Sequence, residues 1–376
     1  MKELPGGLTY ETYVEMLGKE IELVLGRRKE SLDAPFHSVP LTADTLYFGG
    51  GTPSLMPIPN LERIVRKLQA SFDLSTLSEF TLEVNPETIS EENLSGWREL
   101  GINRLSIGVQ SLKDESLLKL GRVYTRKQVL ETLTSNAEVL ANFDVSFDLL
   151  LGVPWQEEAQ VLSDLKELLA FGPKHFSLYG LKMEEGTPFE KLAKSFPELA
   201  PNEDRIADEL LLAEELLSEY GFIRYEVSNF ARESKWSLHN LKYWQMVPTF
   251  AFGVSAVAFD GSIRTHNPRD FHSYASAIEN GILPAILELV TKDELLFERL
   301  ALGLRTIWGV AWEDFPEGVK KTMKERAESL KDDYPELIRE LNSRLSLTGK
   351  GMNVLHRIVL ELAESLIPDN SASVVN

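Results

Sequence analysis

Residues 47–54 read Tyr-Phe-Gly-Gly-Gly-Thr-Pro-Ser and extend an apolar run that begins at Thr45. The run predicts a short buried strand, and three successive glycines cannot continue a strand without a large loss of conformational entropy. Glycines at a strand end expose backbone amides and let the main chain approach a small ligand closely. A tight strand-to-helix turn with positive φ angles explains the glycines equally well. The stretch therefore predicts either such a turn or a ligand site at the end of a strand.

Strands and helices alternate along the first half of the chain. The predicted strands cover residues 45–48, 80–84, 104–109, 145–151 and 175–181. The predicted helices cover residues 13–24, 60–72, 91–100, 126–141 and 158–171, and Thr88 with Glu91 has the spacing of a capping box for the third. This alternation implies parallel strands joined by right-handed crossovers, in a barrel or in an open doubly wound sheet.

Polar residues at the strand ends favour the barrel. Glu83 lies in the second strand, Gln110 follows the third, and Asp148 interrupts the apolar fourth strand. Polar groups at successive carboxyl ends converge on one mouth only if the sheet curves. Each residue alone is also explained as an ordinary strand-end group or as half of a core ion pair, with Arg104 and Arg122 as the nearest partners in sequence. The sequence therefore predicts an α/β fold with a partial barrel.

Composition limits the classes of function. The 376 residues carry a net charge of −19, which argues against loose binding to nucleic acid or to anionic lipid. No apolar run approaches the ~18 residues of a membrane span and no signal peptide is visible, so a cytoplasmic location is expected. The chain has no cysteine, which excludes disulfides, cysteine nucleophiles and thiolate-bound zinc or iron–sulfur clusters for this polypeptide.

The character of the chain changes beyond residue 188. Predicted helices cover residues 204–220, 297–307, 321–330, 335–341 and 352–366, a short strand covers 344–348, and residues 371–376 form a frayed tail. We expect three domains: a partial barrel at 1–190, a segment that completes the barrel and carries a His-Asn-x-x-Tyr-Trp motif at 191–290, and a small, mainly helical, winged-helix-like domain at 291–376. A winged helix often binds nucleic acid, but the charge balance points away from that function.

Several motifs together resemble those of the radical S-adenosylmethionine proteins related to oxygen-independent coproporphyrinogen III oxidase. They are Gly-Gly-Gly-Thr-Pro at 49–53, Leu-Glu-Val-Asn-Pro at 82–86, Asn-Arg-Leu-Ser-Ile-Gly-Val-Gln-Ser at 103–111, Leu-Gly-Arg at 120–122 and Asp-Leu-Leu-Leu-Gly-Val-Pro at 148–154. Arg-Tyr-Glu-Val-Ser-Asn-Phe-Ala at 224–231 and His-Asn-Leu-Lys-Tyr-Trp at 239–244 are similar to segments of the heme chaperone branch. The resemblance covers residues 10–366, nearly the whole chain.

The resemblance implies a site for S-adenosylmethionine. Its residues would be Gly50, Gly51, Thr52, Glu83, Gln110, Arg122 and Asp148, with Lys182 and Val257 as weaker members. The glycines and Thr52 would meet the methionine amino end, and the others the carboxylate, the ribose and neighbouring polar edges. Carboxylates, a guanidinium and amide donors that converge in this way suit a sulfonium zwitterion.

The resemblance also implies a heme site made of His239, Asn240, Tyr243 and Trp244. An imidazole is a good axial ligand for heme iron, so His239 is the predicted metal ligand, and Tyr243 and Trp244 can cover a porphyrin face or edge. A histidine beside aromatic residues is more often an ordinary core residue. The implied partners are heme, heme-accepting apoproteins that include respiratory and membrane-associated ones, and a second copy of the chain in a homodimer, with no nucleic acid.

The chain departs from the family at one point. Members that cleave S-adenosylmethionine hold a 4Fe-4S cluster with a C-x3-C-x2-C motif after a first strand, and neither that strand nor those cysteines is in this sequence. Either the start of the chain is missing or the cluster has been lost, so radical catalysis is not expected of these residues. Three functions stay open: a heme chaperone on a radical S-adenosylmethionine scaffold, a coproporphyrinogen III oxidase whose cluster segment is missing from this chain, and a structural relative with neither activity.

Overall fold

The computed structural model describes residues 7–30, 34–157, 160–183, 188–196, 199–283 and 285–364. The chain divides into two compact units that interleave along the sequence. One, which we call the sheet unit, comprises Leu46–Leu55 and Glu79–Ser237, and the other, the flanking unit, comprises Met1–Thr45, Met56–Ser78 and Leu238–Asn376. The tail predicted at residues 371–376 lies outside the described residues.

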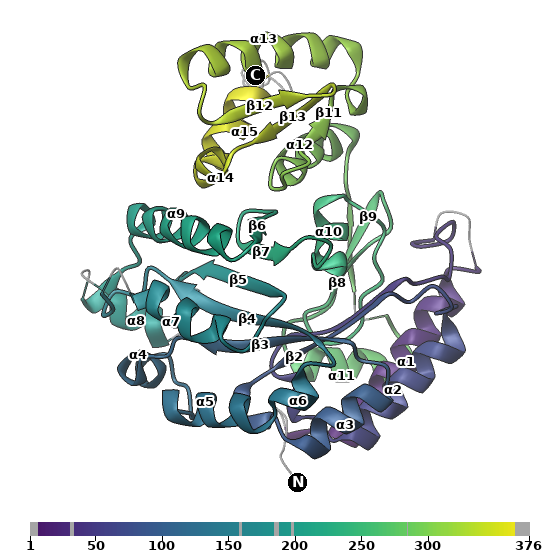
Figure 1. Ribbon diagram of the computed structural model, residues 1–376. Coiled ribbons are helices and arrows are strands. Elements are labelled where there is room, and N and C mark those ends of the chain that lie inside the picture. The colour runs from purple at the N-terminus through teal and green to yellow at the C-terminus, as the bar shows by residue number, and fades with distance from the viewer. Residues whose placement is uncertain are drawn as a thin grey trace. The chain divides into compact units, whose positions relative to one another are not determined.

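Among the described residues, the sheet unit is built on a seven-stranded sheet with the strand order β1-β2-β3-β4-β5-β7-β6 (Figure 1). The bounds are β1 (Thr45–Phe48), β2 (Glu79–Val84), β3 (Arg104–Gln110), β4 (Asp144–Leu151), β5 (His175–Gly180), β6 (Phe222–Arg224) and β7 (Asn229–Arg232). Strands β2 to β5 pair in parallel, and β7 pairs antiparallel with both β5 and β6. Because β1 and β6 are edge strands of the described sheet, the barrel is partial, as predicted.

Helices cover the parallel strands, and Figure 1 shows α5, α6 and α7 beside them. The helices of the sheet unit are α3 (Glu91–Glu99), α4 (Asp114–Lys119), α5 (Arg126–Ser135), α6 (Ala137–Leu140), α7 (Gln160–Leu169), α8 (Pro188–Ser195) and α9 (Glu203–Glu219). Successive strand residues point to opposite faces, and one face of the sheet carries buried apolar side chains such as Leu105 and Phe147. The amphipathic helices bury apolar residues at helical spacing, as Val129 and Leu133 do in α5, so the apolar face is the one that they cover.

Two helix boundaries differ from the prediction. The helix expected at 126–141 is interrupted at Asn136, which separates α5 from α6. The capping box expected from Thr88 is wrong, because Ser90 is the N-cap of α3 and accepts a hydrogen bond from the backbone N–H of Asn93. Thr88 instead donates its hydroxyl to the carbonyl of Asn85 at 2.8 Å. Residues 158 and 159, where a further helix was expected to begin, lie outside the described residues.

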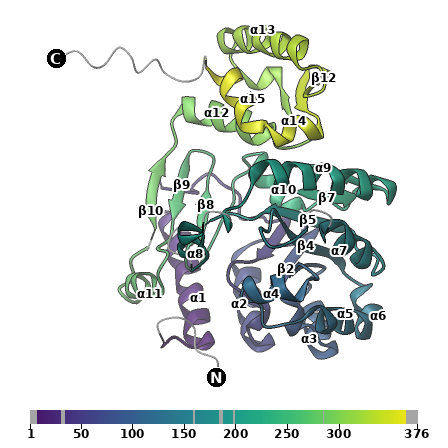
Figure 2. The same ribbon diagram turned by 90° about the vertical axis from the view of Figure 1, so that its left-hand side faces the viewer.

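The flanking unit brings together helices from both ends of the chain. They include α1 (Tyr10–Arg27), α2 (Ile58–Ser71), α10 (Leu238–Trp244) and α11 (Phe271–Glu279), with a sheet in the order β10 (Ile286–Leu289), β9 (Ile263–His266) and β8 (Val257–Phe259). Figure 2 shows α1 and α11 near this sheet, and Met16 of α1 packs in one buried cluster with Tyr274 and Ile278 of α11. None of the helices in the described ranges is long and apolar enough to cross a bilayer.

A buried carboxylate also joins distant segments of the flanking unit. Glu20 of α1 accepts hydrogen bonds from the backbone N–H of Gly253 at 2.8 Å, from Asn267 Nδ2 at 2.5 Å and from Tyr274 OH at 2.7 Å. Burial raises the pKa of Glu20, and these three hydrogen bonds oppose the rise. The carboxylate is tolerated in the core because its oxygens have donors.

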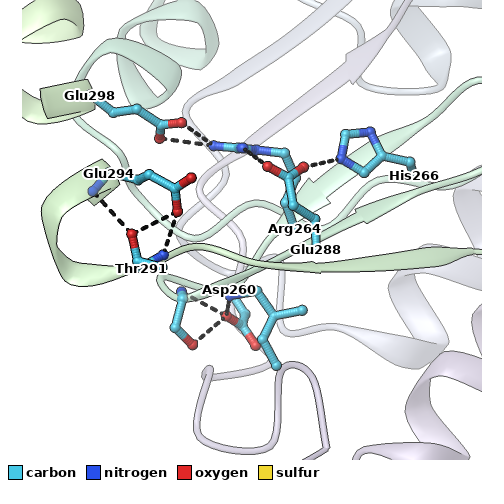
Figure 3. Close-up of polar contacts among 9 residues, drawn as sticks. Asp260, Arg264, His266, Glu288, Thr291, Glu294 and Glu298 are labelled. Atoms are coloured by element: carbon cyan, nitrogen blue, oxygen red, sulfur yellow. Dashed lines mark hydrogen bonds and ion pairs between the residues drawn. The ribbon is translucent and has the colours of Figure 1, made fainter. Parts of the chain in front are cut away.

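Figure 3 shows how α12 (Lys292–Gly303) is joined to the β8–β10 sheet. Arg264 of β9 donates to both carboxylate oxygens of Glu298 in α12, at 2.8 and 3.0 Å, and to Glu288 of β10 at 3.1 Å. The second carboxylate oxygen of Glu288 lies 2.6 Å from His266 Nε2. Nη2 of Arg264 makes both contacts with Glu298 and Nη1 makes the one with Glu288, so a single guanidinium connects the helix to two strands of the sheet by charge-assisted hydrogen bonds.

The last part of the flanking unit has the helices and the small sheet expected of a winged-helix-like domain. Besides α12, the elements are β11 (Val310–Ala311), α13 (Glu317–Asp333), β12 (Ile338–Leu341), β13 (Arg344–Leu347), α14 (Gly349–Asn353) and α15 (Leu355–Ala363), with the sheet in the order β11-β13-β12. The helix predicted at 335–341 is wrong, because most of these residues form β12 in an antiparallel hairpin with β13. Asn342 and Ser343 at its turn have φ angles of 52° and 60°, the conformation that two-residue hairpin loops require.

Candidate functional site

The glycine stretch after β1 lies beside Glu83 of β2. The backbone N–H of Gly50 donates to Glu83 Oε2 at 2.9 Å, and Tyr47 OH donates to Glu83 Oε1 at 2.8 Å. Gly50 and Gly51 have φ angles of 77° and 67°. A Cβ atom on Gly49 would lie 2.5 Å from the Tyr47 ring and 2.8 Å from the Glu83 carboxylate, so only glycine fits there. The glycines therefore make a tight turn and also let the exposed main chain approach a carboxylate.

One face of the sheet is polar across four adjacent strands. Glu83, Ser106, Ser146 and His175 are register partners on β2, β3, β4 and β5. A residue two positions further along a strand shares the same face, which brings Asp148 of β4 onto it. Parallel sheets are commonly apolar on both faces, so a polar face is the feature expected of a ligand site at the carboxyl ends of the strands.

Asp148 lies at the centre of this polar face. Ser106 Oγ donates to its two carboxylate oxygens at 2.8 and 3.1 Å, and Ser146 Oγ donates at 3.3 Å. Burial raises the pKa of Asp148 to about 6, the charge of Glu83 adds to the rise, and hydrogen bonds from Ser177 and Ser106 oppose it. Asp148 is therefore mostly ionised at pH 7 and takes up a proton in mildly acidic solution.

A chain of hydrogen bonds leads from Asp148 into the core. Ser146 Oγ lies 2.8 Å from His175 Nδ1, and Tyr225 OH lies 2.8 Å from His175 Nε2. The backbone N–H of Ser237 donates to Tyr225 OH at 3.1 Å. Burial lowers the pKa of His175 well below its usual value, so its imidazole is neutral and holds a partner at each nitrogen.

Sequence reasoning missed Ser106, Ser146, His175 and Tyr225. A signal for the first three was present, because polar residues recur at alternate positions in the strands that contain them. The pattern is Arg104 and Ser106 in β3, Ser146 and Asp148 in β4, and His175 and Ser177 in β5. Tyr225 follows the short strand β6 and carries no comparable signal.

The other residues predicted for this site are less closely grouped. Thr52 is half-buried directly after the glycines, and Gln110 has a positive φ of 66° where the register between β3 and β4 shifts. Arg122 Nε is buried and has no hydrogen-bond acceptor among the described residues. Lys182 is exposed beyond the end of β5, and Val257 lies on β8 in the flanking unit.

The donor set of the sheet unit fits S-adenosylmethionine but not an iron–sulfur cluster. Glu83 supplies a carboxylate beside the exposed Gly50 amide, Asp148 supplies a second one on the same face of the sheet, and the Nε–H of Arg122 has no acceptor among the described residues. Such a set suits a zwitterionic ligand. The 376-residue chain contains no cysteine, and no group of three His, Asp or Glu side chains among its described residues could hold a metal ion. No reaction step through a cluster follows from these residues.

His239 of α10 is buried, and each of its ring nitrogens has a partner. Nδ1 lies 3.0 Å from Thr45 Oγ1, and Nε2 lies 2.9 Å from Tyr243 OH one helical turn later. Burial lowers the pKa of His239 to about 4, the positive charge of Lys242 adds to the effect, and Asp44 opposes it. The imidazole is therefore neutral at pH 7, the state in which a ring nitrogen can bind a metal ion.

The four residues predicted to bind heme lie on one short helix. His239 and Tyr243 share a face of α10, with their rings edge to face at 5.3 Å between centroids. Asn240 and Trp244 repeat the same spacing one residue later, and the guanidinium of Arg305 lies 4.3 Å from the centre of the Trp244 ring. His239 can offer its Nε2 to a metal only if the Tyr243 hydroxyl, on a side chain that is 44% exposed, moves away.

Comparison with known proteins identifies the family. Residues 37–168 match the Radical SAM superfamily. The heme chaperone HemW of Synechocystis sp. is 37% identical over 74% of this chain and 68% of its own length. The heme chaperone HemW of Bacillus subtilis is 33% identical over 82% of each chain, and that of Lactococcus lactis is 31% identical over 93% of this chain and 92% of its own.

The fold agrees with that of a solved structure. Coproporphyrinogen III oxidase (HemN) from Escherichia coli, a radical SAM enzyme, superposes with a TM-score of 0.71 over 94% of this chain and 83% of its own, at 18% identity. An identity this low shows the fold and not the activity. The resemblance seen in the motifs is confirmed by these matches. The chain belongs to the heme chaperone HemW family, within the Radical SAM superfamily.

Proposed function

We propose that this protein is a heme chaperone, which binds heme through His239 and delivers it to heme-accepting apoproteins. The observation that carries the proposal is a neutral, buried His239 whose Nε2 lies 2.9 Å from the hydroxyl of the exposed Tyr243, in a chain whose relatives are heme chaperones. The partners that the proposal requires are heme and apoproteins, including respiratory ones at the membrane.

The two hydrogen bonds of His239 would have different roles when heme binds. The bond between Nδ1 and Thr45 would stay in place and orient the imidazole, as a hydrogen bond at the other ring nitrogen does for many metal-bound histidines. Nε2 would exchange the Tyr243 hydroxyl for iron, at the cost of one hydrogen bond of about 1 kcal/mol. Burial keeps the imidazole neutral at pH 7, and in the tautomer whose Nδ1–H donates to Thr45 the Nε2 atom carries no proton that would have to leave.

A hemin titration of the whole chain, followed by absorbance, tests the proposal. We expect saturable binding near one heme per chain, weakened at least about tenfold in His239→Ala because an axial ligand is lost. His266→Ala is the matched control, since His266 is a partly exposed histidine in the same unit, paired with Glu288. Delivery is tested by transfer of the bound heme to apomyoglobin. Unchanged affinity and spectrum in His239→Ala would overturn the assignment of the ligand.

We also propose that the sheet unit binds S-adenosylmethionine. Gly50, Gly51 and Thr52 would bind its methionine amino end, and Glu83 and Asp148 would bind its other polar groups. Gln110 and Arg122 complete this set, with Lys182 and Val257 as outer members. Calorimetric titration with S-adenosylmethionine tests the site: Glu83→Gln should weaken binding at least about tenfold, because a charge-assisted hydrogen bond is lost. Coproporphyrinogen III oxidation is not proposed, since these residues include no cluster ligand.

The proposal assigns roles to three segments of the chain. Residues 1–190 would form the radical-SAM-like scaffold, residues 191–290 would carry the heme motif, and residues 291–376 would form the winged-helix-like domain. We further propose that the protein works in the cytoplasm as a homodimer. Light scattering of the purified chain with and without hemin tests the dimer, and a constant monomer mass in both states would exclude it.

A further inference from the structure

The outer edge of strand β10 carries apolar side chains that are open to solvent. Ile286 and Leu289 are each 73% exposed, and Leu287 is 54% exposed. Edge strands of soluble proteins are usually protected by charged residues, by proline or by a covering segment, because an exposed apolar edge attracts other chains. Figure 2 shows β10 at the outside of its sheet, and β10 is the last strand in the order β10-β9-β8. An edge of this kind is a surface on which another polypeptide can bind.

The backbone of β10 also has free groups on this edge. The N–H of Val290 donates to the carbonyl of Ser262, just before β9, at 2.9 Å. Hydrogen-bonded pairs recur at every second residue of an antiparallel ladder. The N–H and C=O groups of Glu288 therefore face β9, and those of Leu287 and Leu289 face the free edge. Within the described ranges, these outward groups have no hydrogen-bond partner.

A small cavity lies on the side of this sheet to which the Leu287 side chain belongs. Leu287, Thr265 of β9 and Ala258 of β8 are register partners, and all three line the cavity. The rings of Phe36 and Phe250 line it as well. Its volume of about 50 Å³ has room for about three or four groups of the size of a water molecule or a methyl. A strand added to β10 would place every second side chain on this side of the sheet, beside the cavity.

The aromatic wall of the cavity is held in an unfavourable backbone conformation. Phe36 has a φ of 63°, in the left-handed region that bulky residues seldom adopt. Asp260 accepts the N–H of Phe36 at 3.1 Å, and Arg28 Nε donates to its carbonyl at 3.0 Å. The Phe36 ring stacks on Phe250 with 4.2 Å between the ring centres. Such a conformation persists where the surrounding contacts over-determine it, and it is frequent at ligand-binding sites.

Charge and size indicate which kind of chain fits this edge. The charged residues of 279–298, the segment that contains β10, are acidic apart from Lys292: Glu279, Glu288, Asp293, Glu294 and Glu298. Arg264 of β9 pairs with two of them. A second copy fits poorly, because each copy carries a net charge of −19 and two strands of four residues bury far less than the ~1,200–2,000 Å² of a stable interface. A short basic segment is attracted to the same surface.

We propose that the free edge of β10 binds an extended segment of a partner protein, with apolar side chains at alternate positions and basic side chains between them. The segment would pair antiparallel with β10 and exchange hydrogen bonds with the outward groups of Leu287 and Leu289. Its residues opposite these two would have their side chains on the cavity side, and the basic residues would lie on the side of Glu288. None of these residues belongs to the proposed heme or S-adenosylmethionine site, so this docking is independent of both.

Fluorescence anisotropy with a labelled peptide, titrated with the whole chain, tests the site. The probe is Lys-Val-Lys-Val-Lys-Val, blocked at both ends, and we expect saturable binding. N-methylation of its valines should weaken binding at least about tenfold, because their amides face β10, whereas N-methylation of its lysines should change it less than about twofold. Glutamate in place of the lysines should weaken binding at least about tenfold, because the segment around β10 is acidic.

Variants of Leu289 test the same edge from the protein side. Leu289→Pro removes an N–H that faces the free edge and keeps the bonds to β9, so it should weaken peptide binding about 3- to 10-fold. Leu289→Asn removes apolar contact area and should weaken binding at least about fivefold. The matched control is Leu341→Asn, because Leu341 of β12 is 72% exposed in the same unit, and its effect should stay under about twofold. Circular dichroism establishes that each variant is folded.

The remaining outcomes decide against the docking site. If the native chain binds the valine-methylated peptide as tightly as the unmodified one, strand pairing is excluded, even if the Leu289 variants fail to fold. Lack of saturable binding of the lysine peptide has the same meaning. A dimer by light scattering that becomes a monomer in Leu289→Pro would assign the edge to a second copy instead. Failure of the native chain to bind hemin would overturn the proposed function and leave this site standing.

Discussion

At the scale of single residues, the hydroxyl of Tyr243 competes with any metal for Nε2 of His239. Tyr243→Phe removes that hydrogen bond and keeps the ring that packs on the imidazole. We expect hemin affinity to rise about 3- to 10-fold, because a neutral hydrogen bond of ~1 kcal/mol no longer has to be broken. Hemin titration checks this, with Tyr220→Phe as control, since Tyr220 is an exposed tyrosine of the sheet unit. An unchanged affinity would mean that Tyr243 does not cover the ligand position.

Asp148 makes stability depend on pH with a predictable sign. Its pKa is raised from 3.8 to about 6, so between these values the folded state binds the proton more tightly than the unfolded state. Stability therefore falls as pH rises through this window and levels off above it. Asp148→Asn should flatten the dependence of the unfolding free energy on pH. The difference in stability between the variant and the native chain should shift in favour of the variant by up to about 3 kcal/mol from pH 4 to pH 7. Urea unfolding between pH 4 and 7.5 measures this, and the exposed Asp332→Asn should leave the slope unchanged.

The candidate sites could be predicted from the sequence only where a local pattern marks them. Gly50, Glu83 and Asp148 interrupt or end apolar strands, so the sequence shows them, and the structure brings Gly50 and Glu83 into contact. Thr45 could not be found in this way, because 194 residues separate it from His239. Arg305 is similarly distant from Trp244 in sequence, and no periodic pattern relates the two.

At the scale of elements, the parallel strands and their helices were predictable because apolar runs and helical periodicity repeat in order. The failures have local causes. Residues 335–341 begin with proline and alternate weakly, which allows a helix, but the turn at Asn342 and Ser343 pairs them with β13 instead. The short strands β8, β9 and β10 carry exposed or half-buried side chains at all positions but one, so no buried face marked them in the sequence.

Gly309, just before β11, shows how closely these small elements pack. Its φ is +56°, and a Cβ atom there would lie 1.8 Å from the carbonyl oxygen of Leu345 in β13. Gly309→Ala should destabilise the protein by about 2–4 kcal/mol, because backbone strain and a clash with main chain add. Gly18→Ala is the control: Gly18 lies in α1 with open space at its Cβ, so about 0.5–1 kcal/mol should be gained. Urea unfolding measures the stability of both variants. If neither variant is less stable than the native chain, the packing described here is contradicted.

At the scale of the whole molecule, Glu20 is a test of how distant segments depend on one another. Glu20→Ala leaves the backbone N–H of Gly253 and the hydroxyl of Tyr274 without this acceptor, and it removes one of the two acceptors of Asn267 Nδ2, which keeps the carbonyl of Gly253. We expect a loss of about 2–4 kcal/mol, since buried polar groups without partners are costly. Glu22→Ala on the same helix breaks only an exposed ion pair with Lys67 and should cost under about 1 kcal/mol. Thermal unfolding of both variants measures these losses. If the unfolding temperatures of Glu20→Ala and Glu22→Ala fall by similar amounts, the Glu20 contacts contribute little.

The α/β class and the partial barrel follow from the order of the elements, which is why they could be predicted. The interleaving of the two units could not, because the strand that precedes the glycines and the helix that follows them give no sign of belonging to different units. Assignment to a unit depends on packing between segments, and packing leaves no local trace in the sequence.

Interleaving has a consequence for how the protein is made. Helix α1 contacts α2, which follows it closely in the chain, but it leaves the ribosome long before its other partners. Glu20 waits for Gly253, 233 residues later, and for Tyr274, 254 residues later. During that interval Met16, which packs on Tyr274 and Ile278, lacks that part of its native surface. The flanking unit can complete its folding only after most of the chain has been synthesised, whereas the strands of the sheet unit meet partners that are near in sequence. The nascent chain thus carries an amphipathic helix with an incomplete native surface through much of its synthesis, a segment that a cellular folding factor would be expected to hold.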